Sequence, residues 1–297
     1  MARAAVRHAL NGTVRLAFEE EGDGPPLLLV HGLAYCRHGW GPAAALLAER
    51  FRVVRFDNRG VGDSDAPRGP YSVGLLASDA VAVLDAAGVE RASVVGVSLG
   101  GLVAQALAVS HPERVERLVL VGSTRGGIGS HGPPHPSLLL LAQAPALERD
   151  ELLRRLVANA LSPRTLAERP ELLEEILAYR RRRAPRLGAW LSQAAAGAWF
   201  GLAGRAGSIA APTLVLHGGA DSVMDVRNGR LLASSIPGAE LLVFEDAGHL
   251  LFWEEPERFV AAVRNFCGAP AVQPRRAPDD RASLSGAREQ PEIEEVR

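Results

Sequence analysis

The chain has 297 residues, of which 47% are hydrophobic and 23% charged, and its formal net charge is −1 at pH 7. These proportions are typical of a globular protein, and the near-neutral charge gives no support for nucleic acid or an anionic membrane as a partner. No window is long and apolar enough to span a bilayer, and the N-terminus shows no apolar segment of a secretory signal. We therefore expect a cytoplasmic protein.

All 33 basic residues are Arg, which indicates the codon bias of a GC-rich, bacterial genome. The two cysteines, Cys36 and Cys267, lie far apart in the sequence and fit no metal-binding spacing. In a reducing compartment we expect both to be free thiols. Neither a metal nor a cofactor is implied.

The first part of the chain predicts a hairpin, two buried strands and a helix. Asn11-Gly12 favours a two-residue turn with positive φ, and residues 3–20 are therefore expected to form a β-hairpin. Apolar runs at 27–30 and 53–56 predict strands covered on both faces. A helical pattern from about residue 73 to 87 follows.

The segment around Ser98 joins a strand directly to a helix. The apolar run 94–97 leads into the pattern Gly-x-Ser-x-Gly, and an apolar helical pattern continues from Leu102. In this strand–turn–helix context the pattern predicts a nucleophile elbow, in which the tight turn excludes side chains at Gly96 and Gly100. We expect the Ser98 hydroxyl to lie above the sheet, at the positive end of the following helix.

The alternation of strands and helices stops after a strand at 118–121. Four helical patterns interrupted by Pro follow, and strands resume at 213–216 and 241–244 before a last helix at 257–266. Because strands separated by helices need right-handed crossovers, we predict an α/β fold with a mostly parallel sheet flanked by helices.

Three units follow from this pattern. Residues 1–124 and 209–267 are predicted to form the core, and residues 125–208, called the insertion below, a helical cap or lid. Residues 268–297 have little apolar periodicity, so we expect a disordered tail.

A serine hydroxyl needs a base and a third group that orients the base before it can act as a nucleophile. Asp221 follows the strand at 213–216, and His249 follows the strand at 241–244. Since the carboxyl ends of parallel strands meet at one edge of a sheet, these residues are expected to lie near Ser98. The chain order Ser98, Asp221, His249 is the order found in α/β-hydrolases.

At this point the chain resembles the α/β-hydrolase fold family, in the branch that contains esterases, lactonases and carbon–carbon-bond hydrolases. The resemblance covers residues from about 13 to 267 and is weakest in the insertion. It is carried by His31-Gly32-Leu33, Asp57 to Ser64, Gly96 to Gly101, Gly218 to Asp221, and Gly248-His249 with Glu255 to Phe259. The resemblance implies an oxyanion hole formed by the backbone N–H groups of Leu33 and Leu99.

Other polar residues near these motifs have their own interpretations, with Asp221 taken as the acid that orients His249. His217 precedes a glycine turn and is expected to be structural. Asp225 stands where similar proteins usually have proline, so it is a rival to Asp221 as the acid. Asp246 is expected to be solvated, and Asp57 and Arg59 to brace their turn.

In the insertion, Pro133 and Pro134 prevent a helix that would bring His131 and His135 together as metal ligands. Trp190, Trp199 and Phe200 are predicted to bind substrate as walls of an apolar pocket. The run Arg180 to Arg183 ends a helix, where cations are favourable in themselves, and anion binding is the alternative interpretation.

These residues predict a serine hydrolase that cleaves a small-molecule carboxylic ester or lactone through an acyl-enzyme. A carbon–carbon-bond hydrolase or a cofactor-free peroxidase using the same triad is the alternative within the enzymes. A non-catalytic receptor for a small ligand is the alternative outside them. The substrate and the oligomeric state are left open.

Overall fold

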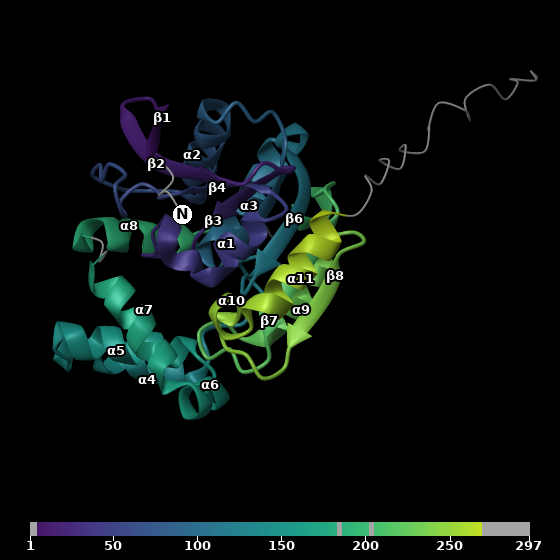
Figure 1. Cartoon of the computed structure of the whole chain (residues 1–297). Helices are drawn as coiled ribbons and strands as arrows, with labels where there is room; N and C mark the ends of the chain where they lie inside the picture. The colour runs from purple at the N-terminus through teal and green to yellow at the C-terminus, as the bar shows by residue number, and fades with distance from the viewer. Residues whose placement is uncertain (1–4, 183–185, 202–204, 269–297) are drawn as a thin grey trace, which may run out of the picture.

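The computed structural model describes residues 5–182, 186–201 and 205–268. An eight-stranded sheet forms its centre (Figure 1). The strands are β1 (Arg7–Asn11), β2 (Val14–Glu21), β3 (Pro26–Val30), β4 (Arg52–Phe56), β5 (Ala92–Val97), β6 (Val115–Val121), β7 (Thr213–Gly218) and β8 (Glu240–Phe244). Their order is β1-β2-β4-β3-β5-β6-β7-β8. Only the pairs β1–β2 and β2–β4 are antiparallel, which confirms the predicted hairpin and mostly parallel sheet.

Helices connect the strands and cover both faces of the sheet (Figure 1). The α-helices outside the insertion are α1 (Pro42–Ala48), α2 (Val73–Ala86), α3 (Leu99–Ser110), α9 (Val226–Ser235), α10 (Leu251–Glu254) and α11 (Pro256–Cys267). Short 3₁₀ turns lie at Arg37–Trp40, Pro112–Arg114, Ala144–Ala146 and Ala206–Ser208. Among the described helices none is long and apolar enough to cross a membrane.

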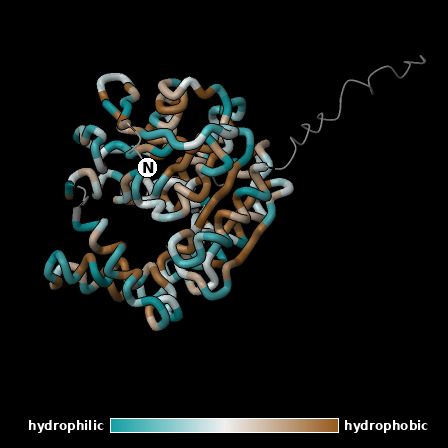
Figure 2. Tube along the Cα trace, in the orientation of Figure 1, coloured by the Kyte–Doolittle hydropathy of each residue, from teal (hydrophilic) through white to brown (hydrophobic). Residues whose placement is uncertain are grey.

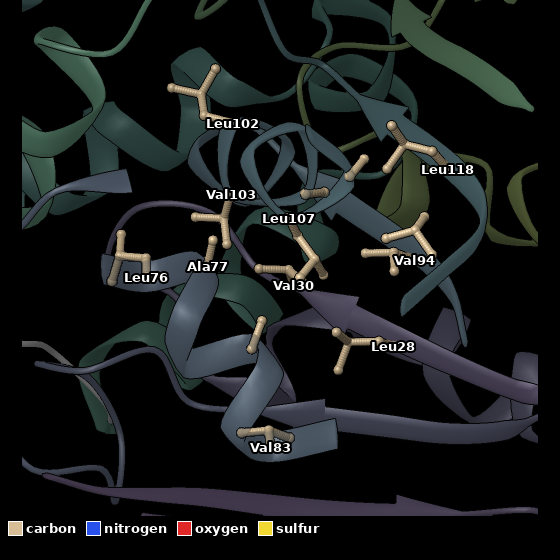
Figure 3. Packing of buried hydrophobic residues seen from close by; sticks show 14 of the residues in the cluster. Leu28, Val30, Leu76, Ala77, Val83, Val94, Leu102, Val103, Leu107 and Leu118 are labelled. Carbon is tan, nitrogen blue, oxygen red and sulfur yellow. The ribbon is translucent and has the colours of Figure 1, made fainter. Parts of the chain in front are cut away.

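The parallel strands divide the core into two clusters because successive side chains of a strand point to opposite faces. In β3, Leu28 and Val30 belong to the cluster under α2 and α3, whereas Leu27 and Leu29 belong to the cluster under α1 and α11. Figure 3 shows side chains of the first cluster, which come from the strands and from α2 and α3. Burial on both faces explains the continuous apolar runs of these strands.

The insertion contains α4 (His135–Gln143), α5 (Arg149–Ala160), α6 (Pro163–Glu168), α7 (Pro170–Arg182) and α8 (Leu187–Ala198). Figure 1 shows α4 to α7 grouped apart from the helices that cover the sheet. Ile176 of α7 and Val157 of α5 are buried in the same cluster as α1 and α11. Ala196 of α8 packs into the other cluster. The insertion is therefore continuous with the core of the protein.

The prediction named no helix at α9 or at the two short helices α6 and α10. Pro163 and Pro170 bound α6 within six residues, and α10 has four residues, so neither is long enough to show a helical period. Both cysteines are free and buried. The predicted disordered tail lies outside the described residues, apart from Gly268. Figure 2 shows hydrophobic segments concentrated along the central strands.

Candidate active site

Ser98 occupies the predicted turn between β5 and α3. Its backbone has φ 54° and ψ −119°, a left-handed conformation that side chains disfavour and that costs about 1–3 kcal/mol. A methyl group at Gly96 would lie 2.3 Å from the Gly100 carbonyl oxygen, and one at Gly100 would lie 2.0 Å from that of Val30. Glycine is therefore required at both positions, as the pattern predicted.

Backbone hydrogen bonds hold this turn in place. The Ser98 N–H donates to the Val121 carbonyl over 2.9 Å, and the Ser98 carbonyl accepts from Gly101 N–H and the Ser123 hydroxyl, each at 2.9 Å. Within the described chain the Ser98 hydroxyl makes no hydrogen bond of its own. It is available to a neighbouring base.

His249 and Asp221 form a buried pair, in which His249 Nδ1 lies 2.7 Å from Asp221 Oδ2. The other carboxylate oxygen of Asp221 accepts the N–H groups of Val223 and Met224, each at 2.8 Å. Burial lowers the pKa of His249, but the charge and hydrogen bond of Asp221 outweigh it, so this pKa is raised above 6.5. The pair orients the imidazole ring and leaves Nε2 as an acceptor when the ring is neutral.

The two alternatives near Asp221 have other partners. Asp225 caps α9: it accepts the Arg227 N–H at 2.9 Å and pairs with the Arg227 guanidinium, which lowers the pKa of Asp225 to about 2. His217 is fully buried, and its Nε2 lies 2.9 Å from the Met224 carbonyl and 3.5 Å from Asp221 Oδ2. Burial lowers the pKa of His217, so the ring is neutral and braces the loop that carries Asp221.

The loop that carries His249 is tied to the insertion. The N–H groups of His249 and Leu250 both donate to the Ala160 carbonyl at the end of α5, at 2.9 and 3.2 Å. The N–H of Gly248 donates to Glu254 Oε1 over 2.9 Å. His249 is thus held by its backbone from one side and by Asp221 from the other.

Glu254 is a buried carboxylate shared between this loop and the insertion. Its Oε2 accepts the Ser162 N–H at 2.9 Å and the Thr165 hydroxyl at 2.7 Å, while Oε1 accepts from Gly248. The negative charge of Glu254 also contributes to the raised pKa of His249. Sequence reasoning missed this residue, although an acid that directly follows the apolar run 250–253 is a signal that could have found it.

The loop after β3 faces Ser98. A methyl group at Gly32 would lie 3.1 Å from Ser98 Cβ and 3.7 Å from its hydroxyl oxygen, so the chain at Gly32 passes close to the Ser98 side chain. Leu33, the next residue, lines the same cavity as Ser98. Leu99 is the first residue of α3, where an N–H has no intrahelical acceptor. The residues that carry the two predicted oxyanion donors therefore lie beside Ser98, Leu33 in the wall of its cavity and Leu99 next to it in the chain.

Side chains of the insertion hold this loop, which we call the oxyanion loop (residues 31–37). Gln193 of α8 accepts the Ala34 N–H at 3.1 Å and donates to the Arg59 carbonyl at 2.9 Å. The Tyr179 hydroxyl of α7 accepts the Cys36 N–H at 3.1 Å and donates to the Cys36 carbonyl at 3.2 Å. Neither residue was identified from the sequence.

The start of the oxyanion loop is shaped by a neutral histidine. His31 Nδ1 accepts the Gly32 N–H at 2.7 Å, and the imidazole stacks on Tyr35 with ring centroids 4.7 Å apart. Burial lowers the pKa of His31 to about 3, so the ring remains an acceptor at neutral pH. At the other end, Asp57 accepts the Arg37 N–H at 2.6 Å and pairs with the Arg37 side chain. Both ends of the loop are thus fixed.

A cavity of about 260 Å³ joins these groups. Ser98 and His249 both line it, next to the oxyanion loop. The remaining walls come mainly from apolar side chains of the insertion, including Leu140 of α4 and Val157 of α5. The arrangement suits a small, largely apolar molecule that presents one reactive carbon to Ser98.

The three aromatic residues of the insertion are placed differently. Trp190 lines the cavity. Trp199 follows the last residue of α8 and is 90% exposed, and Phe200 packs against the core cluster under α2 and α3. Neither Trp199 nor Phe200 contributes to the described cavity wall, so the prediction is corrected for these two. The sequence shows where α8 ends but not which way the residues beyond it turn.

The other candidates have structural partners. Asp57 accepts the Asp63 N–H at 2.8 Å across its turn, whereas Arg59 pairs with Asp79 of α2. Asp246 is paired with Arg164 at the surface. No His131 to His135 helix forms, since α4 begins at His135, and the described residues contain no cluster suited to a metal ion.

The arginine run divides between two environments. Arg180 lines the cavity, whereas Arg181 pairs with Asp150 on the outside of the insertion, with both guanidinium contacts below 2.8 Å. The side chain of Arg182 and all of Arg183 lie outside what the structure describes.

Known proteins match over most of the chain. The family model for the alpha/beta hydrolase fold matches residues 25–199 and 170–256. A putative carbamate hydrolase, RutD, from Azorhizobium caulinodans is 31% identical over 263 residues, which cover 88% of this chain and 98% of the relative.

Two solved structures show the same similarity. Est816, described as an N-acyl homoserine lactone degrading enzyme, has a TM-score of 0.76 at 34% identity and covers 88% of this chain and 100% of its own. The enol-lactonase from Burkholderia xenovorans has a TM-score of 0.78 at 28% identity, with 89% of this chain and 100% of its own covered. Together with the family match, these findings show that the chain belongs to the α/β hydrolase fold family.

Proposed function

We propose that the protein is a serine hydrolase that cleaves a small carboxylic ester or lactone through an acyl-enzyme. The observation that supports this most strongly is the buried pair of His249 and Asp221 at the same cavity as the strained Ser98 turn. The names of similar proteins also support it, since they include an esterase, an enol-lactonase and a putative carbamate hydrolase, whose named substrates are all carbonyl compounds. The insertion acts as a lid that shapes the cavity.

In the first half of the reaction, Ser98 attacks the carbonyl carbon of the substrate. His249 Nε2 accepts the hydroxyl proton as the bond from Ser98 Oγ to carbon forms. Asp221 stabilises the resulting imidazolium through the 2.7 Å contact at Nδ1 and keeps the ring in the required tautomer. The N–H groups of Leu33 and Leu99 donate to the oxyanion of the tetrahedral intermediate.

Collapse of this intermediate breaks the bond to the leaving oxygen, which takes the proton from His249. The acyl group is then an ester of Ser98. In the second half, a water molecule gives a proton to His249 and attacks the acyl carbon, and His249 returns the proton to Ser98 as the acid product leaves. The electron-pair movements need no cofactor.

The proposal is tested with 4-nitrophenyl esters and lactones of increasing chain length, with Ser98→Ala as the matched control. We expect saturable turnover by the wild type, a rapid burst of nitrophenol that approaches one equivalent per chain, and neither with Ser98→Ala. A folded wild-type protein that binds but turns over none of these compounds would instead favour a small-ligand receptor. Cleavage of a carbon–carbon bond with no ester hydrolysis would instead favour a carbon–carbon-bond hydrolase.

A further inference from the structure

Arg180 lies in the last turn of α7 and lines the cavity together with Ser98 and His249. Within the described lining it is the single permanently charged side chain, and no carboxylate is present. A guanidinium stays protonated at any physiological pH. One end of a largely apolar cavity therefore carries a fixed positive charge.

The guanidinium of Arg180 is held in a defined position. Its central carbon lies 4.0 Å from the centroid of the Tyr35 ring, and one nitrogen donates to the Ala34 carbonyl over 3.3 Å. Both partners belong to the oxyanion loop, next to Leu33. This arrangement uses one face of the guanidinium and one N–H group, which leaves further donors for a ligand in the cavity.

Arg180 has no carboxylate partner within the described chain, and its one hydrogen bond goes to a backbone carbonyl. Arg59 pairs with the buried Asp79, and the adjacent Arg181 pairs with Asp150. A charge that is partly removed from water is normally balanced by an opposite charge. The positive charge of Arg180 also acts on His31 in the same cavity wall: burial lowers the pKa of His31, and the charge of Arg180 lowers it further.

We propose that Arg180 binds a free carboxylate of the substrate, so that the substrate class is an ester or lactone of an acid that carries a second carboxyl group. This inference rests on the proposed function. A planar carboxylate matches the fork of guanidinium donors, and the contact strengthens in a site lined by apolar groups such as Leu140 and Val223. The hydrocarbon part of the substrate lies against these apolar walls.

The test uses pairs of 4-nitrophenyl esters. One member is the monoester of succinic, glutaric or adipic acid, and the other has a methyl ketone in place of the free carboxylate. We compare kcat/KM for wild type, Arg180→Met, Arg180→Lys and the matched control Arg181→Met, which removes an external arginine. For the best chain length, we expect the wild type to prefer the acid, and Arg180→Met to lower the acid-to-ketone ratio about 10- to 100-fold.

The remaining results separate binding of the carboxylate from bracing of the oxyanion loop. Arg180→Lys should retain part of the preference, and Arg181→Met all of it. If Arg180 only braces Tyr35, Arg180→Met will slow both members of each pair equally, and the proposal is overturned. A wild type without preference for the acid at any chain length also overturns it, while ester hydrolysis as such still stands. If neither member of any pair is hydrolysed, the proposed function fails and this inference fails with it.

Discussion

The two sides of the cavity are built by different means. On the core side, backbone hydrogen bonds hold the Ser98 turn, and close backbone contacts at Gly96 and Gly100 admit only glycine. On the insertion side, Tyr179, Arg180 and Gln193 hold the oxyanion loop through contacts of their side chains. A side-chain substitution in the insertion removes a contact to the oxyanion loop directly. It does not easily move the Ser98 turn, which the backbone holds. We therefore expect the reaction to depend on the core side and substrate choice on the insertion side.

The largest expected effect is on the core side. Ser98→Ala and His249→Ala should each lower kcat by a factor on the order of 10⁶, as in another serine hydrolase whose triad acts as a unit. Steady-state kinetics of the double variant is the measurement. It should be little worse than either single variant, and losses that multiply would show that the two residues act independently.

Asp221→Asn should lower kcat by roughly 10⁴, because the amide favours the wrong tautomer of His249. The wild-type kcat/KM should rise with pH through a pKa above 6.5, since His249 acts when neutral and Asp221 raises its pKa. Removal of the carboxylate charge lowers that pKa, so the acid limb of the profile should move to lower pH. Asp225→Asn is the control, and a large loss there would transfer the role of acid to Asp225.

Glu254→Gln tests the buried carboxylate that links the His249 loop to the insertion. An amide cannot accept all three hydrogen bonds that the carboxylate takes from Gly248, Ser162 and Thr165, and a buried unpaired donor costs about 1–3 kcal/mol of unfolding free energy. A displaced His249 loop should lower kcat/KM by up to about 100-fold.

A purely structural role for Glu254 is distinguished by the pH profile. Its charge raises the pKa of His249, so Glu254→Gln should move the acid limb to lower pH, by less than Asp221→Asn does. Glu255→Gln, which removes a carboxylate paired with Arg258 at the surface, should leave the profile unchanged. An unshifted profile in Glu254→Gln would confine this residue to stability.

The smallest effect is expected on the insertion side. Trp190 lines the cavity, so Trp190→Ala should change the ratio of kcat/KM between short and long acyl esters by about tenfold. This is the discrimination that one or two methylene groups provide in an apolar pocket. The exposed Trp199 provides the control, and Trp199→Ala should leave this ratio within about twofold. Equal ratios in all three proteins would exclude Trp190 as a specificity residue.

The sequence predicted the sheet, the Ser98 turn and the loops that carry Asp221 and His249 because each is encoded locally. Two glycines, a buried apolar run and a position after a strand are visible without knowledge of the fold. The roles of Glu254, Gln193 and Tyr179 depend on contacts between segments roughly 90 to 160 residues apart. Such contacts have no signature in one sequence, and the positions of Trp199 and Phe200 could not be predicted for the same reason.

Covalent trapping shows whether Ser98 is a nucleophile that His249 activates. The protein is treated with a fluorophosphonate, and intact mass and peptide mapping locate the adduct. We predict one adduct per chain on Ser98, formed at a strongly reduced rate in His249→Ala and absent in Ser98→Ala. An adduct on another residue, or a folded wild-type protein that forms none, would rule out Ser98 as the activated nucleophile.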